Sequence, residues 1–269
     1  MNSDSGTYLS HWGLQHKPFE NVPDPSSFYL SDSHSWALNL LEYALRERKA
    51  AALLTGEYGT GKTTMIRVLL DGIDLEVCRT VLINYPLVEG EALLRHILRQ
   101  MDAADDSATH KIDLYDRLGR CFLDNAGRGL HNLVILDEAQ SLPMDSLYEE
   151  LRLLLNYQLN DRNLVTLLLV GQDDLWHRVS RMPQLADRFA VKCRLQELDQ
   201  EQTTTYIHHR LEHFGGAPSI FSDDALRLIH ESSKGIPRRI NNLCDLALLM
   251  GFQRHLNSVG PDVIKAIWV

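Results

Sequence analysis

The sequence lacks several features that would point away from a cytoplasmic protein. Its 269 residues contain no run of 18 apolar residues, so no membrane span is predicted. Residues 1–11 lack the basic-then-apolar order of a secretory signal. The four cysteines form no C-x-x-C pair, which disfavours a zinc site or a disulfide framework and predicts core thiols. We therefore expect a cytoplasmic protein.

An excess of positive charge is also absent. Lys and Arg number 27 against 36 Asp and Glu, and the net charge is −9. This balance disfavours a uniformly basic surface for nucleic acid, but it leaves room for a local basic patch.

The first strong motif is a phosphate-binding pattern. Gly56, Gly61, Lys62 and Thr63 satisfy G-x-x-x-x-G-K-[ST], after the apolar run 50–55 and before residues with helical spacing. Such a loop aims several backbone N–H groups at one point, and the helix adds its positive N-terminal end. We predict a P-loop in which Lys62 reaches the β- and γ-phosphates and the Thr63 hydroxyl is a ligand to Mg²⁺. The alternative is a glycine-rich turn with an exposed lysine.

A second motif is an apolar strand, residues 133–136, that ends in Asp137 and Glu138. At the carboxyl end of a parallel strand beside a P-loop, Asp137 is expected to hold Mg²⁺, directly or through water. Glu138 is expected to orient or deprotonate the attacking water. The alternative is an ordinary strand followed by an acidic turn.

Gln172 follows another apolar run, residues 164–170. A polar side chain leaving a strand next to the acidic pair could touch the γ-phosphate or the attacking water. The alternative is a helix cap formed by residues 172–174.

Arg188 precedes a strand expected at residues 190–195. An arginine at the far edge of a nucleotide domain can reach the γ-phosphate of a neighbouring subunit, and such an arginine accelerates hydrolysis about 10³- to 10⁵-fold. The alternative is a salt bridge to Asp187 or another nearby acid.

The segment Gly235-Ile236-Pro237-Arg238 opens a helix with an arginine in its first turn. That end of a helix is positive, so Arg238 is expected to serve an external anion, the γ-phosphate of ATP.

The predicted elements indicate an α/β fold with three parts. Residues 1–30 form a proline-containing extended segment that packs on the ATPase core, where its aromatic residues either cover an adenine ring or pack plainly. Residues 31–197 form a P-loop domain with a parallel sheet flanked by helices. Residues 198–269 form a small all-α lid domain, with helices expected at 199–214, 222–233, 237–252 and 261–268.

The predicted site uses ATP and Mg²⁺. The catalytic positions are Glu138, Arg188 and Gln172. The metal positions are Thr63 and Asp137. The nucleotide-binding positions are Gly56, Glu57, Tyr58, Gly59, Thr60, Gly61, Lys62, Thr63, Thr64 and Arg238.

These motifs together resemble an AAA+ ATPase with a C-terminal helical lid. A closer resemblance, to the ExeA/GspA family of secretion and pilus-biogenesis ATPases (MshM-like), covers nearly the whole chain. It is carried by His11-Trp12-Gly13-Leu14, Lys17-Pro18-Phe19, Pro23-Asp24-Pro25, Phe28-Tyr29-Leu30-Ser31, Leu54-Thr55-Gly56-Glu57, Val170-Gly171-Gln172, Tyr206-Ile207-x-x-Arg210-Leu211 and Gly235-Ile236-Pro237-Arg238-Arg239-Ile240-Asn241.

The resemblance implies a Mg²⁺-dependent ATPase that self-associates into a ring or filament with nucleotide sites between subunits. It would drive or regulate assembly of a secretion or type IV pilus-like envelope machine, through a protein partner that could recruit it to the inner membrane. Because the family is similar to the TniB/TnsC transposition ATPases, the alternative is an ATP-dependent DNA-binding regulator of transposition. A third possibility is a nucleotide-gated scaffold that scarcely hydrolyses ATP.

Overall fold

The computed structural model describes residues 8–267 except 75, 85–89, 104–109 and 143, and the side chains of 144–148 also lie outside this description. The described residues form two compact units. The α/β unit comprises those of 34–56 and 68–195, and the helical unit comprises those of 1–33, 57–67 and 196–269.

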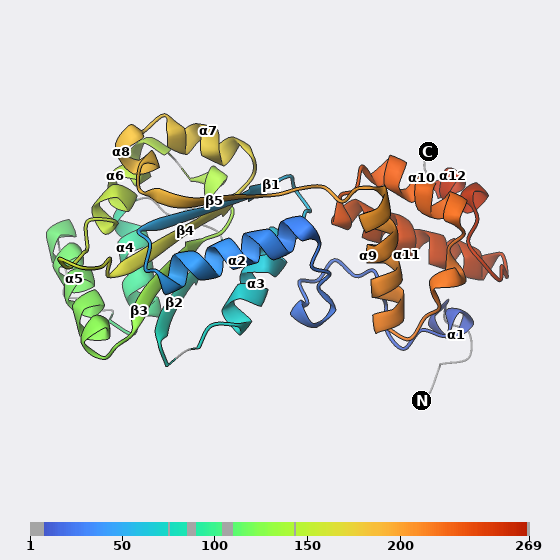
Figure 1. Cartoon of the computed structure of the whole chain (residues 1–269), viewed down its shortest axis with the longest axis horizontal. Helices are drawn as coiled ribbons and strands as arrows, with labels where there is room; N and C mark the ends of the chain where they lie inside the picture. Colours follow the sequence, from blue (N-terminus) through green and yellow to red (C-terminus); the bar gives the residue numbers. More distant parts are fainter. Residues whose placement is uncertain (1–7, 75, 85–89, 104–109, 143, 268–269) are drawn as a thin grey trace. The chain divides into compact units, whose positions relative to one another are not determined.

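The α/β unit is built on a parallel sheet of five described strands, in the order β2-β3-β4-β1-β5 (Figure 1). The strands are β1 (Ala51–Gly56), β2 (Cys78–Ile83), β3 (His131–Leu136), β4 (Val165–Gly171) and β5 (Phe189–Leu195). The helices are α2 (Asp32–Arg46), α4 (Gly90–Gln100), α5 (Lys111–Gly127), η2 (Ala139–Ser141), α6 (Met144–Leu154), α7 (Asp174–Ser180) and α8 (Pro183–Ala186). The predicted α/β P-loop fold is confirmed.

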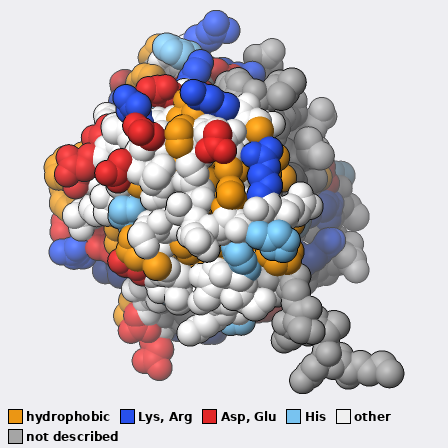
Figure 2. Space-filling view, turned by 90° about the vertical axis from the view of Figure 1, so that its right-hand side faces the viewer, with side chains coloured by type: hydrophobic (Ala, Val, Ile, Leu, Met, Phe, Trp, Pro, Cys, Tyr) orange, Lys and Arg blue, Asp and Glu red, His pale blue; other side chains and the backbone are white. Residues whose placement is uncertain are grey.

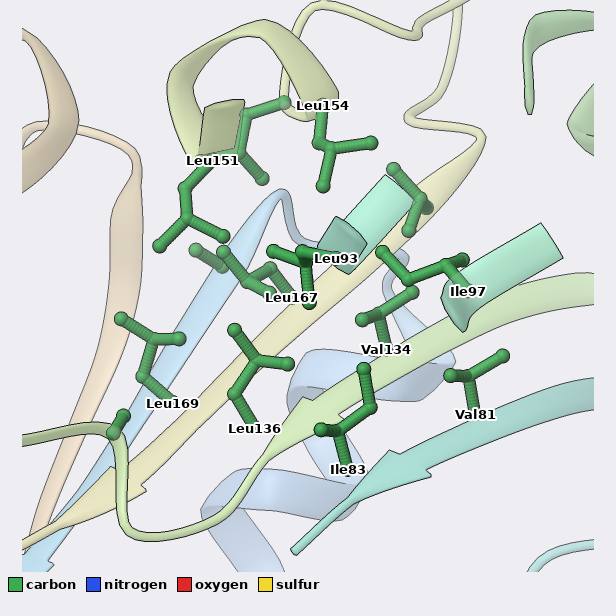
Figure 3. Packing of buried hydrophobic residues seen from close by; sticks show 14 of the residues in the cluster. Val81, Ile83, Leu93, Ile97, Val134, Leu136, Leu151, Leu154, Leu167 and Leu169 are labelled. Atoms are coloured by element: carbon green, nitrogen blue, oxygen red, sulfur yellow. The ribbon is translucent and has the colours of Figure 1, made fainter. Parts of the chain in front are cut away.

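The central strands form a sheet because they are apolar on both faces. β1, β3 and β4 are buried along their whole length, which is the pattern of a parallel sheet covered on both sides. Figure 3 shows one face, where side chains of α4 and α6 pack on alternate residues of β2, β3 and β4; its labelled residues are Val81, Ile83, Leu93, Ile97, Val134, Leu136, Leu151, Leu154, Leu167 and Leu169. The intervening strand residues face the opposite side, along which α2 runs in Figure 1.

The helical unit contains the P-loop residues 57–67 as well as both terminal segments. Its helices are α1 (Tyr8–Trp12), η1 (Pro25–Ser27), the first part of α3 (Lys62–Asp71), α9 (Gln200–His213), η3 (Pro218–Ile220), α10 (Asp223–Ser233), α11 (Pro237–Gln253) and α12 (Pro261–Ile267). The Ser222 side chain caps α10 by accepting from the N–H of Ala225, and the Asp199 side chain caps α9 by accepting from the N–H of Gln202. The helical character predicted for the C-terminal part is confirmed, whereas the domain boundaries remain a prediction.

The described part of the N-terminal segment packs within the helical unit. Trp12, Leu14 and Phe19 are buried in the hydrophobic core formed with residues of α9, α10, α11 and α12. The Trp12 indole N–H donates to the carbonyl of Leu248 at 2.9 Å. For Trp12 and Phe19 these contacts agree with plain packing, one of the two predicted alternatives. Residues 1–7 of the predicted segment lie outside the described residues.

Arg210 of α9 holds this segment in place through polar contacts. It is 7% exposed, and its Nε donates to the carbonyl of Pro18 at 2.6 Å while one Nη donates to the Ser27 hydroxyl at 3.0 Å. Its guanidinium also lies over the ring of Phe214, 5.6 Å from the centroid. A buried guanidinium needs such acceptors because it cannot lose its charge.

The cysteines behave as the sequence predicted. Cys78, Cys193 and Cys244 are buried, Cys121 is half-buried, and all four are free thiols. Burial raises the pKa of the Cys78 thiol to about 11, with Arg48 opposing the shift. Thiols with raised pKa values are poor nucleophiles at neutral pH.

The surface of the helical unit is mixed in character. On the face shown in Figure 2, the coloured acidic, basic and hydrophobic side chains are interspersed. None of the described helices has both the length and the hydropathy needed to cross a membrane.

Candidate nucleotide site

Three of the predicted motifs leave the sheet at one edge. β1 and β4 pair with Thr55 opposite Gly171, and β3 and β4 pair with Leu136 opposite Leu169. The strands are parallel, so their carboxyl ends share an edge, which we call the carboxyl edge. The P-loop continues directly from β1, the acidic pair from β3 and Gln172 from β4. Open parallel sheets bind ligands at this edge.

The P-loop backbone turns at its glycines. Gly59 and Gly61 have φ values of 89° and 100°, a region that other residues rarely adopt. The Thr60 hydroxyl donates to the carbonyl of Glu57 at 2.8 Å and closes the turn. The loop leads into α3, whose first residue is Lys62, so the loop adjoins the positive end of a helix, an arrangement that favours phosphate.

Lys62 is held inside the loop. It is 5% exposed, and its ammonium group donates to the carbonyl of Glu57 at 3.1 Å. The alternative of a glycine-rich turn with an exposed lysine is therefore wrong. Thr63 and Thr64 follow in the first turn of α3 and are half-buried.

Arg238 lies beside the P-loop within the helical unit. Its backbone N–H donates to the carbonyl of Gly59 at 3.2 Å, and its guanidinium carbon lies 4.9 Å from the centroid of the Tyr58 ring. A Cβ atom added to Gly59 would lie 2.7 Å from Cβ of Arg238, so only glycine allows this approach. The sequence predicted Arg238 for its charge, and the structure places it next to the loop.

The acidic pair differs in burial and in direction. Asp137 is 2% exposed, and one of its carboxylate oxygens accepts the N–H of Glu138 at 2.9 Å. Glu138 has φ 55° and ψ 35°, a left-handed conformation that is unusual for glutamate. The chain therefore turns sharply between the two acids.

Gln140 is not among the residues predicted from the sequence. Its amide nitrogen Nε2 donates to Oε2 of Glu138 at 2.5 Å, and its amide oxygen Oε1 accepts the N–H of Gln172 at 3.1 Å. It thus joins the residue after β4 to the acidic pair after β3. No local pattern indicates this role, because it depends on the pairing of two strands.

Gln172 has an exposed side chain at the end of β4. Its backbone N–H is used by Gln140, and α7 begins at Asp174 without a side-chain cap from Asp173. Asp173 instead accepts hydrogen bonds from Nε and Nη2 of the Arg194 guanidinium. These contacts leave the predicted sensor role of Gln172 open to test.

Arg188 lies at the opposite edge of the sheet, immediately before β5. β5 starts beside Ala51 and ends beside Gly56, and at about 3.3 Å per residue these strand ends are roughly 17 Å apart. One guanidinium nitrogen of Arg188 donates weakly to the Asn156 side chain at 3.4 Å. Among the described residues it makes no ion pair, so the salt bridge to Asp187 is not formed.

The donor groups suit ATP and Mg²⁺. A loop with two left-handed glycines, a lysine and a helix N-terminus is a phosphate-binding arrangement. Thr63 and Asp137 offer hydroxyl and carboxylate oxygens, which are the ligands that Mg²⁺ prefers.

Comparison with known proteins agrees with this geometry. Residues 45–179, about half of the chain, match the family described as AAA domain. The chain is 36% identical over 250 residues to General secretion pathway protein A of Aeromonas hydrophila, an alignment that covers 92% of this chain and 45% of that protein. The chain thus spans less than half the length of this relative.

Solved structures share the fold. The ORC2 protein of Aeropyrum pernix in ADPNP-ADP complexes superposes with a TM-score of 0.69 at 19% identity, covering 94% of this chain and 71% of that one. Drosophila ORC bound to DNA gives a TM-score of 0.71 at 15% identity, and the superposition covers 100% of this chain and 67% of that one.

Proposed function

Because the chain belongs to the AAA family of P-loop ATPases and is an ATP hydrolase, we propose that it works as an oligomer in the assembly of a secretion or pilus-like envelope machine. The predicted relationship to the ExeA/GspA family is confirmed. The observation that carries the proposed process is the likeness to General secretion pathway protein A, which extends over 92% of the chain.

The residues at the carboxyl edge have separate duties in this proposal. Lys62 and the N–H groups of the P-loop bind the phosphates of ATP, as in other loops of this type. Thr63 and Asp137 would hold Mg²⁺, which when bound neutralises charge on the phosphates. Glu138 takes the proton of the attacking water, and Gln172 contacts that water or the γ-phosphate.

The position of Arg188 supports the proposed self-association. This arginine lies at the edge of the sheet away from the P-loop strand end, so it is too far to serve the site of its own subunit. An arginine supplied by a neighbouring subunit stabilises the charge that develops during phosphoryl transfer. We therefore propose a ring or filament whose sites lie between subunits.

The partner in this proposal is a protein of the envelope machine. The described helices include no candidate membrane span. In this proposal, that partner recruits the ATPase from the cytoplasm to the inner membrane.

A second candidate function, ATP-dependent DNA binding as in transposition regulators, is favoured by one observation. Beside the starts of β2 and β3 lies a depression of about 520 Å³ whose lining includes four arginines, Arg79, Arg117, Arg120 and Arg128. Guanidinium groups are suited to phosphate, and their clustering is unexpected in an acidic chain. Asp102 and Asp124 also line the depression and offset part of this charge, and Asp102 pairs with Arg79 at 2.5 Å.

Hydrolysis is tested first. Lys62→Ala is expected to lose most ATP affinity by calorimetry, and Glu138→Gln is expected to bind ATP, hydrolyse it slowly and accumulate assembled particles in negative-stain images. Arg239→Ala, a change to an exposed arginine of α11, serves as the control. Wild-type turnover in Glu138→Gln would contradict the proposed chemistry.

The process is tested by binding to a DNA duplex, measured by fluorescence anisotropy with ATP and Mg²⁺ at two salt concentrations. The envelope proposal expects no ATP-dependent binding. Binding that weakens steeply with salt and stimulates hydrolysis would support the second candidate, and it should then be lost in Arg120→Glu with Arg128→Glu.

A further inference from the structure

The side chain of Gln140 lies between the ends of two strands of the α/β unit. It lies in η2, directly after the acidic pair, and the residues that it contacts belong to the ends of β3 and β4. The position of Gln140 is well defined, because both polar atoms of its side chain and its backbone carbonyl form hydrogen bonds.

The chemistry of the partners fixes which way the amide points. The Glu138 carboxylate can only accept hydrogen bonds, so it must face the Nε2 donor of Gln140, at 2.5 Å. The N–H of Gln172 can only donate, so it must face Oε1, at 3.1 Å. A side chain with one donor end and one acceptor end is therefore required here.

Two further features hold Gln140 in this position. Arg178 of α7 donates to its backbone carbonyl at 2.7 Å, and the same guanidinium pairs with Asp174 at 2.9 Å. Gly171, the last residue of β4, leaves space for the amide, because a Cβ atom there would lie 2.4 Å from Oε1 of Gln140.

Glu138 needs such support because its backbone is strained. It adopts φ 55°, which carries a cost for a residue with a Cβ atom and persists only where neighbouring groups impose it. The hydrogen bond from Gln140 uses Oε2; in the proposed role of Glu138 as the base, the other carboxylate oxygen, Oε1, faces the attacking water.

We infer that Gln140 is a positioning residue for hydrolysis, which fixes the Glu138 carboxylate at the carboxyl edge and ties its orientation to the end of β4. This inference rests on the proposed role of Glu138 as the base. Gln140 touches neither ATP nor water in this role; it acts through Glu138. A base misplaced by about 1 Å can lose on the order of 100-fold in rate.

The test compares three variants under saturating ATP. Gln140→Ala removes both contacts of the amide. Gln140→Glu keeps an acceptor for the N–H of Gln172 but loses the donor to Glu138. This variant therefore tests the contact that positions the base while the contact to the end of β4 is retained. Ser141→Ala is the matched control, since it removes a hydroxyl bond to the backbone carbonyl of Glu138 in the same turn and leaves the carboxylate contact intact.

The expected result is a loss of about 10- to 100-fold in kcat for Gln140→Ala and Gln140→Glu, with KM for ATP within about twofold of wild type. Gly171→Ala, whose Cβ atom would displace the Gln140 amide, is expected to lower kcat in the same way. The kcat of Ser141→Ala is expected to stay near that of wild type. In a Glu138→Gln background, measured by single turnover, Gln140→Ala should cause no further loss.

Several results would overturn the inference. These are an unchanged or raised kcat in folded Gln140→Glu, a rise in KM as large as the fall in kcat, or an equal loss from Gln140→Ala when Glu138 is already Gln. Circular dichroism of each variant shows whether it is folded, and Gln140→Glu decides the outcome if Gln140→Ala does not fold. The proposed function fails separately, if wild type has no turnover or if Glu138→Gln retains it.

Discussion

The guanidinium of Arg238 stacks on the ring of Tyr58, with 4.9 Å between the guanidinium carbon and the ring centroid. A cation over an aromatic face is attracted by the electron-rich ring, and an exposed pair of this kind contributes about 0.5–1 kcal/mol. The contact is weak enough to be exchanged for a phosphate. The Tyr58 ring therefore keeps the arginine beside the P-loop before nucleotide arrives.

Arg238→Ala is expected to weaken ATP binding by about tenfold to 100-fold, because a charge-assisted hydrogen bond to the γ-phosphate contributes about 1.5–3 kcal/mol. ADP binding should change much less, since ADP lacks that phosphate. Isothermal titration calorimetry with both nucleotides measures the difference, and Arg239→Ala is the control because it alters the neighbouring exposed arginine. Equal losses for ATP and ADP would contradict the predicted role.

Arg188→Ala is expected to bind ATP with wild-type affinity and to lose hydrolysis in the assembly, by about 10³-fold or more. Mixing provides the sharper measurement. Arg188→Ala subunits mixed with Glu138→Gln subunits should recover activity, because some interfaces then pair an intact Glu138 with an intact Arg188. Arg181→Ala, a change to an exposed arginine between α7 and α8, is the control. Mixed assemblies that form but remain inactive would show that Arg188 does not act between subunits.

Gly235→Ala is expected to lower the free energy of unfolding by about 2 kcal/mol or more. Gly235 has φ 70°, and a Cβ atom there would lie 1.8 Å from the carbonyl oxygen of Leu198, whose N–H donates to the carbonyl of Gly235. Urea denaturation measures the change. The control is Gly127→Ala at the end of α5, where an added Cβ meets nothing within 4 Å and a small gain in stability is expected. An unchanged free energy of unfolding in Gly235→Ala would contradict this prediction and would mean that the backbone around residue 235 can relax.

The pH dependence of stability is expected to carry a contribution from His131, which is 5% exposed and bonded through Nε2 to the Thr166 hydroxyl at 2.7 Å. Burial, with a smaller effect of Arg48, lowers the pKa of His131 from 6.5 to about 4. Between these values the unfolded chain binds the proton and the native chain does not, so stability falls as the pH drops from about 6.5 to about 4. The full loss is about 3 kcal/mol.

Denaturation of wild type and His131→Gln from pH 4 to pH 8 measures this contribution. The difference in unfolding free energy between the two proteins should shift in favour of the variant as the pH falls through this range. His16→Gln, which changes an exposed histidine, should parallel wild type. Parallel curves for His131→Gln and wild type would contradict the assignment.

Much of this fold could be predicted because its signals are local. Buried parallel strands are continuous apolar runs, and the predicted strand at 164–170 differs from β4 by one residue at each end. Ser222 and Pro237 mark the starts of α10 and α11 as expected. Lys62, Asp137 and Glu138 were predicted as site residues because phosphate and metal chemistry restricts which residues follow a strand, and their roles stay predictions.

Other features could not be predicted because they depend on residues distant in sequence. The partners of Trp12 and Arg210 lie 236 and 192 positions away, so the aromatic pattern of the N-terminal segment gave no sign of where it packs. Gln140 was overlooked for the same reason, since its partner Gln172 belongs to a different strand end. Local spacing indicates that a residue is buried or polar, whereas its contacts depend on the topology.

The packing of Trp12 in the helical unit also determines the order of events during synthesis. Leu248, which accepts the indole N–H of Trp12, is made 236 residues after it. At about 5–20 residues per second this interval is on the order of 10–50 s. During that time the sheet of the α/β unit can be completed while Trp12 and Phe19 remain without their core. We therefore expect the nascent chain to expose an aromatic segment that a chaperone could bind until α11 and α12 have been translated.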